Sequence, residues 1–142
     1  MEDLRFRLYR DDDHDALQHW LAERRPATFP PAPALIPKSS SFVAADEHDR
    51  PVALAIFYVC GDAPVAMLSW LFTDPGIGMF RAHAAAELAI RGGLYCLDRQ
   101  KICMILSRLS TRGSAKMLAR EGFEPVQEVK TEMGRIKTYE TI

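Results

Sequence analysis

The sequence lacks the features of a secreted, membrane-spanning or disulfide-rich protein. Its 142 residues include three cysteines, Cys60, Cys96 and Cys103, and no C-x-x-C pair. This sparse, odd set predicts neither a disulfide framework nor a zinc site, and we expect all three thiols to be buried apolar groups. No apolar stretch approaches the roughly 20 residues that span a bilayer, and the N-terminus lacks a signal peptide's basic and apolar regions. We therefore expect a cytoplasmic protein with no membrane partner.

An excess of charge of either sign is also missing. The chain has 18 basic and 19 acidic residues, a formal net charge of −1, and no basic run longer than Arg24-Arg25. Nucleic-acid binding usually needs a clearly basic face, so we expect no nucleic-acid partner. Hydrophobic residues make up 48% of the chain. That share is enough for one core, and we expect a single domain over residues 1–142.

The first third of the chain predicts a strand, a helix and a proline-rich connection. Apolar and basic residues alternate over Leu4–Tyr9, as in a half-buried strand. The acidic cluster Asp11–Asp15 could hold a metal, but it lacks calcium-loop spacing and is more simply the start of a helix that stops before Pro26. Five of the nine prolines fall within Arg25–Lys38. We expect an ordered loop or short broken helix there.

A three-stranded antiparallel meander follows. Apolar segments over Phe42–Ala45, Pro51–Val59 and Val65–Thr73 are separated by short polar turns. The third segment is almost continuously apolar, which is typical of a central strand covered on both faces.

A helix and a parallel strand come next. Apolar residues recur at helical spacing from Met79 to Leu94, and Gly92-Gly93 is expected to end or weaken this helix. The short apolar run Ile102–Leu106 predicts a buried strand. A strand, a helix and a strand in this order imply a parallel crossover.

The remaining segments predict a last helix and a terminal strand. The helix spans Thr111–Glu121, and Gly122 suits the left-handed position after it. Phe123 would then fold back onto Leu118 in a Schellman motif. Alternation over residues 129–139 predicts a final strand.

Two local patterns, together with this order of elements, indicate a family resemblance. One is a strand ending in Leu71-Phe72-Thr73-Asp74-Pro75, followed by glycines and a helix; the other is the helix over Ser114–Phe123 that ends in Gly-Phe. With them the chain resembles the GCN5-related N-acetyltransferase superfamily over essentially its whole length. Pro51-Val52, Phe57-Tyr58 and the span from Trp70 to Pro75 look most like compact proteins of this fold encoded by tailed bacteriophages. The resemblance implies an α/β fold: a mostly antiparallel central sheet with one splayed parallel strand pair and flanking helices.

The resemblance also implies a cofactor, acetyl-CoA, and an amine acceptor that is a small molecule or a protein. Acetyl-CoA would lie where the third meander strand splays from its parallel neighbour, with its pyrophosphate on the loop that opens the next helix. Helix N-termini carry unpaired N–H groups and partial positive charge, and glycines let the backbone approach a phosphate closely. The alternative for this loop is a plain tight turn. The cofactor-binding positions implied are Phe72, Thr73, Gly76, Ile77, Gly78, Met79 and Arg81.

The sequence departs from the family at the positions that carry the chemistry. Thr73 stands where the family loop has Gln or Arg, and Thr111 stands where many members have Asn. Leu118 replaces the Tyr that protonates the leaving thiolate, and leucine cannot transfer a proton. The segment 51–73 contains no Glu to act as general base. An acceptor that arrives as a free amine would not strictly need one.

The remaining polar residues give weaker candidates. Tyr58 and Tyr139 are possible replacement acids, although tyrosines on strands are more often core residues with a polar tip. His83 is expected to be a partly buried or surface residue rather than a catalytic one. The other histidines lie among polar residues and are expected to be solvated: His14, His19 and His48.

Three functional hypotheses follow. The first is an N-acyltransferase that moves an acetyl group from acetyl-CoA to an amine. The alternative is a catalytically degenerate scaffold or binding protein of the same fold. The third is a homodimer formed through Trp70 or the proline-rich segment. Because Arg25–Lys38 contains no acidic residue, a neutral or acidic acceptor is expected rather than a polycation.

Overall fold

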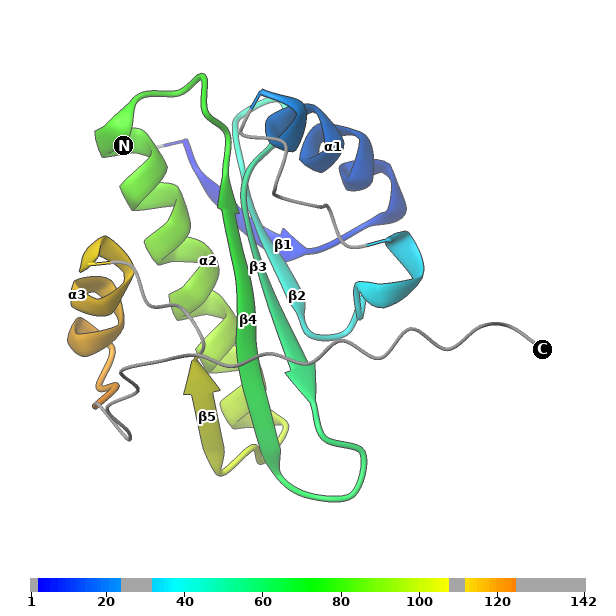
Figure 1. Cartoon of the computed structure of the whole chain (residues 1–142), viewed down its shortest axis with the longest axis vertical. Helices are drawn as coiled ribbons and strands as arrows, with labels where there is room; N and C mark the ends of the chain where they lie inside the picture. The colour runs from blue at the N-terminus through cyan, green and yellow to red at the C-terminus, as the bar shows by residue number, and fades with distance from the viewer. Residues whose placement is uncertain (1–2, 24–31, 108–111, 125–142) are drawn as a thin grey trace.

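A five-stranded sheet forms the centre of the computed structural model, which describes residues 3–23, 32–107 and 112–124 (Figure 1). Strand order follows chain order, and every neighbouring pair is antiparallel except the last, which is parallel. The predicted fold class is therefore confirmed. The strands are β1 (Arg5–Leu8), β2 (Ser41–Ala45), β3 (Pro51–Val59), β4 (Val65–Thr73) and β5 (Met104–Ser107).

Helices cover both faces of this sheet. Helix α1 packs on one face, and α2 and α3 pack on the other (Figure 1). No helix in the described part of the chain is both long and apolar enough to cross a membrane. The predicted terminal strand over residues 129–139 lies outside the described residues. The helical elements are η1 (Asp11–Asp13), α1 (His14–Ala22), η2 (Pro33–Leu35), α2 (Met79–Arg99) and α3 (Arg112–Arg120).

Strand β4 contains one extra residue. Ile56 of β3 lies opposite Trp70, while the next residue, Phe57, lies opposite Leu68. Ser69 therefore has no counterpart on β3 and forms a β-bulge. A bulge shifts the two-residue alternation of a strand by one, so the side chains after Ser69 point to the opposite face from the one that alternation would give.

This bulge explains the apolar run of β4. Ala66 and Leu68 pack with α2 and α3, whereas Trp70 and Phe72 pack on the α1 side. Leu71, between Trp70 and Phe72, packs against the α2 core. The strand therefore contributes side chains to the cores on both faces, as expected, although Met67, before the bulge, is only partly buried.

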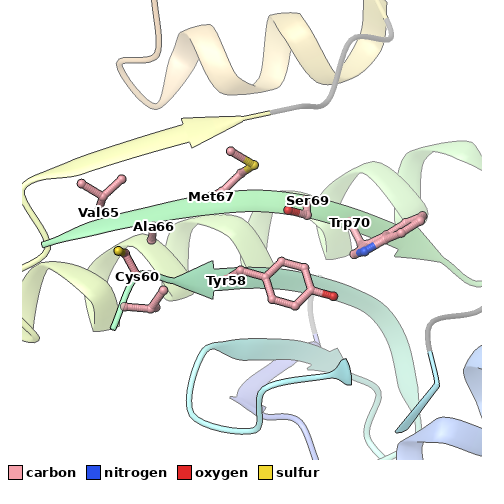
Figure 2. Close-up of a pocket in the computed structure, with 8 residues that line it drawn as sticks. Tyr58, Cys60, Val65, Ala66, Met67, Ser69 and Trp70 are labelled. Carbon is pink, nitrogen blue, oxygen red and sulfur yellow. The ribbon is translucent and has the colours of Figure 1, made fainter. Parts of the chain in front are cut away.

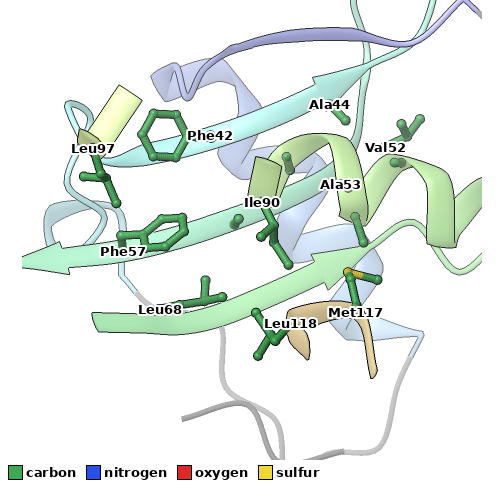
Figure 3. Packing of buried hydrophobic residues seen from close by; sticks show 14 of the residues in the cluster. Phe42, Ala44, Val52, Ala53, Phe57, Leu68, Ile90, Leu97, Met117 and Leu118 are labelled. Carbon is green, nitrogen blue, oxygen red and sulfur yellow. The ribbon is translucent and has the colours of Figure 1, made fainter. Parts of the chain in front are cut away.

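Helix α2 lies unusually close to the sheet. It runs without a break through Gly92-Gly93, so of the two expected effects of this pair, ending the helix is excluded and weakening it stays a prediction. A Cβ on Gly93 would lie 2.6 Å from the ring of Phe42 and 2.9 Å from that of Phe57. A Cβ on Gly92 would lie 2.3 Å from the ring of Phe6. The glycines therefore let the helix backbone rest on the phenylalanine rings of the core, two of which are seen in Figure 3.

An ion-pair cluster joins β1, the start of α1 and the β2–β3 turn. The Arg7 guanidinium donates to both carboxylate oxygens of Asp13 at 2.8 Å and to Asp49 Oδ1 at 2.8 Å. Arg10 donates to Asp49 Oδ2 at 2.7 Å, and its backbone N–H donates to Asp13. These contacts match the predicted role of the acidic cluster at a helix start. The hydrogen bond from Arg10, followed by that from Arg7, lowers the pKa of Asp49.

The end of α3 follows the predicted Schellman motif. Gly122 has φ 92°, in the left-handed region. The Phe123 N–H donates to the Leu118 carbonyl at 3.0 Å, and the Gly122 N–H donates to the Ala119 carbonyl at 3.1 Å. Both bonds satisfy carbonyls that the helix end leaves unpaired.

Two burial expectations are wrong. His14 is buried rather than solvated, because it starts α1 on the same stripe as Leu17. Cys60 and Cys103 are exposed, since each lies just outside a strand. Cys96, in α2, is half-buried at the margin of the core.

Strand β5 is also more open than expected. Met104 is 54% exposed, and the other three residues of the strand are half-buried. The strand borders β4 on one side only among the described residues, so less of it is covered than in a central strand.

Replacing Gly93 with alanine is expected to destabilise the protein. The new methyl group would overpack the ring of Phe42, at a cost of about 1–3 kcal/mol that exceeds the roughly 1 kcal/mol gained in helix propensity. Gly113 in α3 is the matched control, because a Cβ there meets nothing within 4 Å. Gly113→Ala should therefore be neutral or stabilising. Urea unfolding of both variants tests this, and equal stabilisation by both would refute the close-packing argument.

Asp49→Asn is expected to lower stability at neutral pH but not in acid. The folded-state pKa of Asp49 is lowered, so its contribution is full above the ordinary carboxyl pKa of about 3.9 and is lost as pH falls through the lowered value. Asparagine also tolerates the left-handed backbone at this position (φ 62°). Urea midpoints of the two proteins should converge as pH falls through the lowered pKa of Asp49, and also in high salt. A gap that persists in acid would assign the effect to the turn rather than to the charge.

Candidate functional site

Among the described residues, the edge of β4 that faces β5 is paired over part of its length. Parallel pairing joins Val65–Leu68 to Met104–Ser107, and Ser107 is the last residue described before the gap at 108–111. From Ser69 to Phe72, no described residue pairs with this side of β4. A strand edge without a neighbouring strand offers its backbone N–H and C=O groups to another partner.

A short turn carries the chain from this edge into α2. The Asp74 N–H donates to the Val52 carbonyl at 2.9 Å, which ties the start of the turn to β3. The Asp74 side chain then accepts a hydrogen bond from the Gly76 N–H at 2.8 Å. This local bond shapes the turn, as aspartate commonly does. It also means that the Gly76 N–H is already engaged and is not a free donor.

Gly78 begins the helix in a conformation that needs glycine. Its φ of 79° and ψ of 156° lie in a region that is essentially restricted to glycine. A Cβ there would meet nothing within 4 Å, so backbone conformation rather than crowding makes the requirement. The first helical bond runs from the Ala82 N–H to the Gly78 carbonyl at 3.0 Å. The backbone N–H groups of α2 that precede Ala82 have no acceptor within the described part of the chain.

This helix end suits an anion. Helix α2 is 21 residues long, and its first turn contains no acidic residue. Met79 and Phe80 are 77% and 87% exposed, and Arg81 is half-buried. Unpaired N–H groups and the positive end of the helix dipole together form a ready anion-binding geometry.

The structure places the predicted cofactor-binding residues in different settings. The Phe72 side chain is buried and stacks on Trp70 at 5.5 Å in the α1 core. Thr73 lies opposite Ala53 in the sheet, and Ile77 packs against the core beside α2. The side chains of Phe72 and Ile77 are therefore engaged in core packing, which leaves their backbone groups for a cofactor. The open helix end comprises Gly78, Met79, Phe80 and Arg81, of which Phe80 was not predicted.

A pocket of about 670 Å³ lies beside the bulge (Figure 2). It was not found from the sequence, although Ser69, the only polar residue between Met67 and Phe72, was a possible signal for a break in the strand. None of the described lining residues is charged. They are Tyr58, Val59, Cys60, Val65, Ala66, Met67, Ser69 and Trp70.

Polar residues on the exposed side of α2 bind α3 rather than this pocket. Arg91 donates to Glu87 at 3.0 Å and to Glu121 at 2.9 Å, and the bond to Glu121 raises the pKa of Arg91. His83 lies 3.8 Å from Glu87 and 3.4 Å from Arg120. As predicted, His83 is a surface residue. This network fastens the last described helix to α2.

Leu118, at the position where the family resemblance implies a proton-donating Tyr, lies in the core. It is 5% exposed and packs with α2 and the sheet (Figure 3). A proton donor at this position would have to enter the core.

The chain matches no known protein family model and no curated protein. Its fold is nevertheless similar to several solved acetyltransferases. The aminoglycoside N-acetyltransferase AAC(6')-Iy, solved with a bisubstrate analogue of CoA, has a TM-score of 0.65 and 16% identity over 95% of this chain and 100% of that one.

Two further structures give the same result. An aminoglycoside acetyltransferase from an uncultured soil metagenomic sample, solved with trehalose, has a TM-score of 0.63 and 12% identity over 96% of this chain and 97% of that one. An acetyltransferase of Trypanosoma brucei has a TM-score of 0.62 and 16% identity over 94% and 100% of the two chains. At these identities the likeness establishes the fold.

Gly78→Ala is expected to destabilise the protein by about 1–3 kcal/mol, although it removes no contact. The cost is the backbone conformation that alanine must adopt. Gly61 in the β3–β4 turn is the matched control, because a Cβ there also meets nothing within 4 Å and its φ is not positive. Chemical denaturation should show a loss for Gly78→Ala only; equal effects would remove the argument for a strained helix start.

Proposed function

We propose that this chain is an acetyl-CoA-dependent N-acyltransferase of the GCN5-related superfamily, which transfers an acetyl group to an amine. One observation carries the proposal. The β4 edge from Ser69 to Phe72, which pairs with no described residue, leads through a short turn into a helix end whose first N–H groups have no described acceptor and whose first turn has no acidic residue. The same fold occurs in acetyltransferases solved with CoA or a CoA conjugate, which supports this use of the two features.

The residues present fit acetyl-CoA at two places. The β4 edge offers backbone donors and acceptors to an amide-containing chain, as one strand does to another. The helix end from Gly78 to Arg81 offers its N–H groups to a pyrophosphate, and Arg81 adds a positive charge. When bound, acetyl-CoA supplies a thioester as the acyl donor. The residues of the chain would hold the thioester and the amine next to each other at Ser69.

The absence of a general base on β3 and β4 is consistent with this chemistry. Burial in an apolar pocket disfavours a charged ammonium group and so lowers the amine's pKa. A neutral amine held beside the thioester gains much of its rate from proximity alone. Tyr58 is the candidate proton donor to the departing thiolate, since it is the only phenol among the described lining residues.

The alternative is a scaffold of the same fold that has lost catalysis. Leu118 in the core and the absence of Glu over residues 51–73 favour it. The phage resemblance, a cytoplasmic location and a homodimer stay predictions.

Millimolar acetyl-CoA is expected to raise the thermal midpoint of the purified protein by several degrees. A ligand at 100 times its Kd stabilises the native state by about 2.7 kcal/mol. Differential scanning fluorimetry with acetyl-CoA and with free CoA provides the measurement. No shift with either compound would favour the scaffold.

In the Met79→Asp variant, stability and cofactor binding are expected to change in opposite directions. An aspartate in the first turn of α2 should stabilise the free protein by about 0.3–1 kcal/mol through the helix dipole, while repelling a pyrophosphate. Its free midpoint should rise and its shift with acetyl-CoA should shrink. Met79→Asn is the uncharged control and should keep the shift. A full shift in the aspartate variant would place the phosphates elsewhere.

A further inference from the structure

The walls of the pocket beside Ser69 come from two neighbouring strands. Tyr58 of β3 lies directly opposite Met67 of β4, and Trp70 follows the bulge. Tyr58 and Trp70 both pack towards the α1 side of the sheet. In Figure 2 the ring of Tyr58 extends from β3 towards the end of β4 that carries Trp70. Two aromatic side chains and a thioether thus face one recess.

The chemistry of these walls is apolar. Tyr58, Trp70 and Met67 offer aromatic faces and a polarisable sulfur, which suit a flat apolar group. No carboxylate is among the described lining residues. Asp62, in the adjacent turn, accepts from the Cys60 thiol at 3.3 Å and does not line the recess. A ligand with several positive charges would find no counter-charge on these walls and would pay the cost of desolvation.

The size and position of the pocket fit a substrate site. Its volume of about 670 Å³ lies within the usual range for small-molecule sites, about 300–1,000 Å³. Ser69 lines it, and from Ser69 to Phe72 no described residue pairs with the outer edge of β4. An amine anchored there by its apolar part would therefore end close to a thioester held along that edge.

From these observations we infer that the pocket binds an arylalkylamine, a primary amine with an aromatic group, as the acyl acceptor. The reaction part of this inference rests on the proposed function, whereas the binding part does not. The amine nitrogen forms a C–N bond to the thioester carbonyl carbon, and the C–S bond breaks. The nitrogen loses one proton, and the departing thiolate gains one to become the thiol of CoA.

The first experiment compares acceptors at a fixed concentration of acetyl-CoA. The probes are 2-phenylethylamine, spermine and kanamycin, and the readouts are release of the CoA thiol and the mass of the acetylated amine. We expect kcat/KM for 2-phenylethylamine to exceed that for either polycation by at least about tenfold. Direct binding of 2-phenylethylamine, with and without CoA, is measured in parallel by calorimetry.

Met67→Glu adds a negative charge to the uncharged lining of the pocket. The new carboxylate should weaken 2-phenylethylamine at least about tenfold relative to spermine, because it favours a second positive charge over an apolar ring. Met67→Leu keeps the apolar volume and should retain the original preference. Tyr95→Glu, on the exposed face of α2, controls for added charge and should change nothing. Circular dichroism confirms that each variant is folded.

The outcomes separate this inference from the proposed function. Cofactor binding with turnover of spermine or kanamycin but not of 2-phenylethylamine overturns the inference and keeps the acyltransferase. Cofactor binding with no binding of 2-phenylethylamine also overturns the inference. The protein could instead bind 2-phenylethylamine but not CoA, and lose the amine binding in the Met67→Glu variant. This outcome supports the pocket assignment and refutes the acyltransferase. An unchanged preference in Met67→Glu places the acceptor outside this pocket.

Discussion

The insertion of Ser69 into β4 is the constraint from which the arrangement of the site follows. A strand has a period of two, so one extra residue moves all later side chains to the opposite face. Trp70 and Phe72 thereby join the α1 core, while Ala66 and Leu68 stay beneath α2. The described parallel pairing with β5 runs up to Leu68, the residue before the bulge. One local irregularity therefore supplies side chains to both cores, and the recess lies beside it.

The second constraint is the close seating of α2. At Gly93 the backbone of α2 packs on the rings of Phe42 and Phe57, and this contact anchors the helix. The turn that follows β4 is fixed to β3 through Asp74 and Val52. With both anchors in place, the first turn of α2 follows the end of β4 through a short turn. The anion-binding geometry is thus a consequence of packing elsewhere, and its own residues are free to be exposed.

Sequence patterns predicted what depends on local signals. The bounds of β3 and β4 were predicted correctly because polar turns flank strong apolar segments, and the Schellman motif followed from Gly122 and Phe123. The bulge was not predicted, because it is a relation between two strands rather than a property of one. The close packing at Gly92-Gly93 was not predicted for the same kind of reason. Intrinsic propensity lets a glycine pair end or weaken a helix, whereas the phenylalanine rings that require the pair come from distant segments.

The same distinction explains why the site was only half predicted. The helix start was visible as Gly76 and Gly78, but the pocket is assembled from Tyr58, Met67 and Trp70 on two strands. The missing catalytic residues and the apolar pocket then have one physical interpretation. A family site with a Glu and a Tyr manages protons with side chains. In the proposed acyltransferase, an uncharged pocket would instead disfavour the ammonium form of the acceptor, so desolvation would do part of the work of a base. The absence of Glu over residues 51–73 and a pocket with no charged residue among its described lining are therefore consistent with each other.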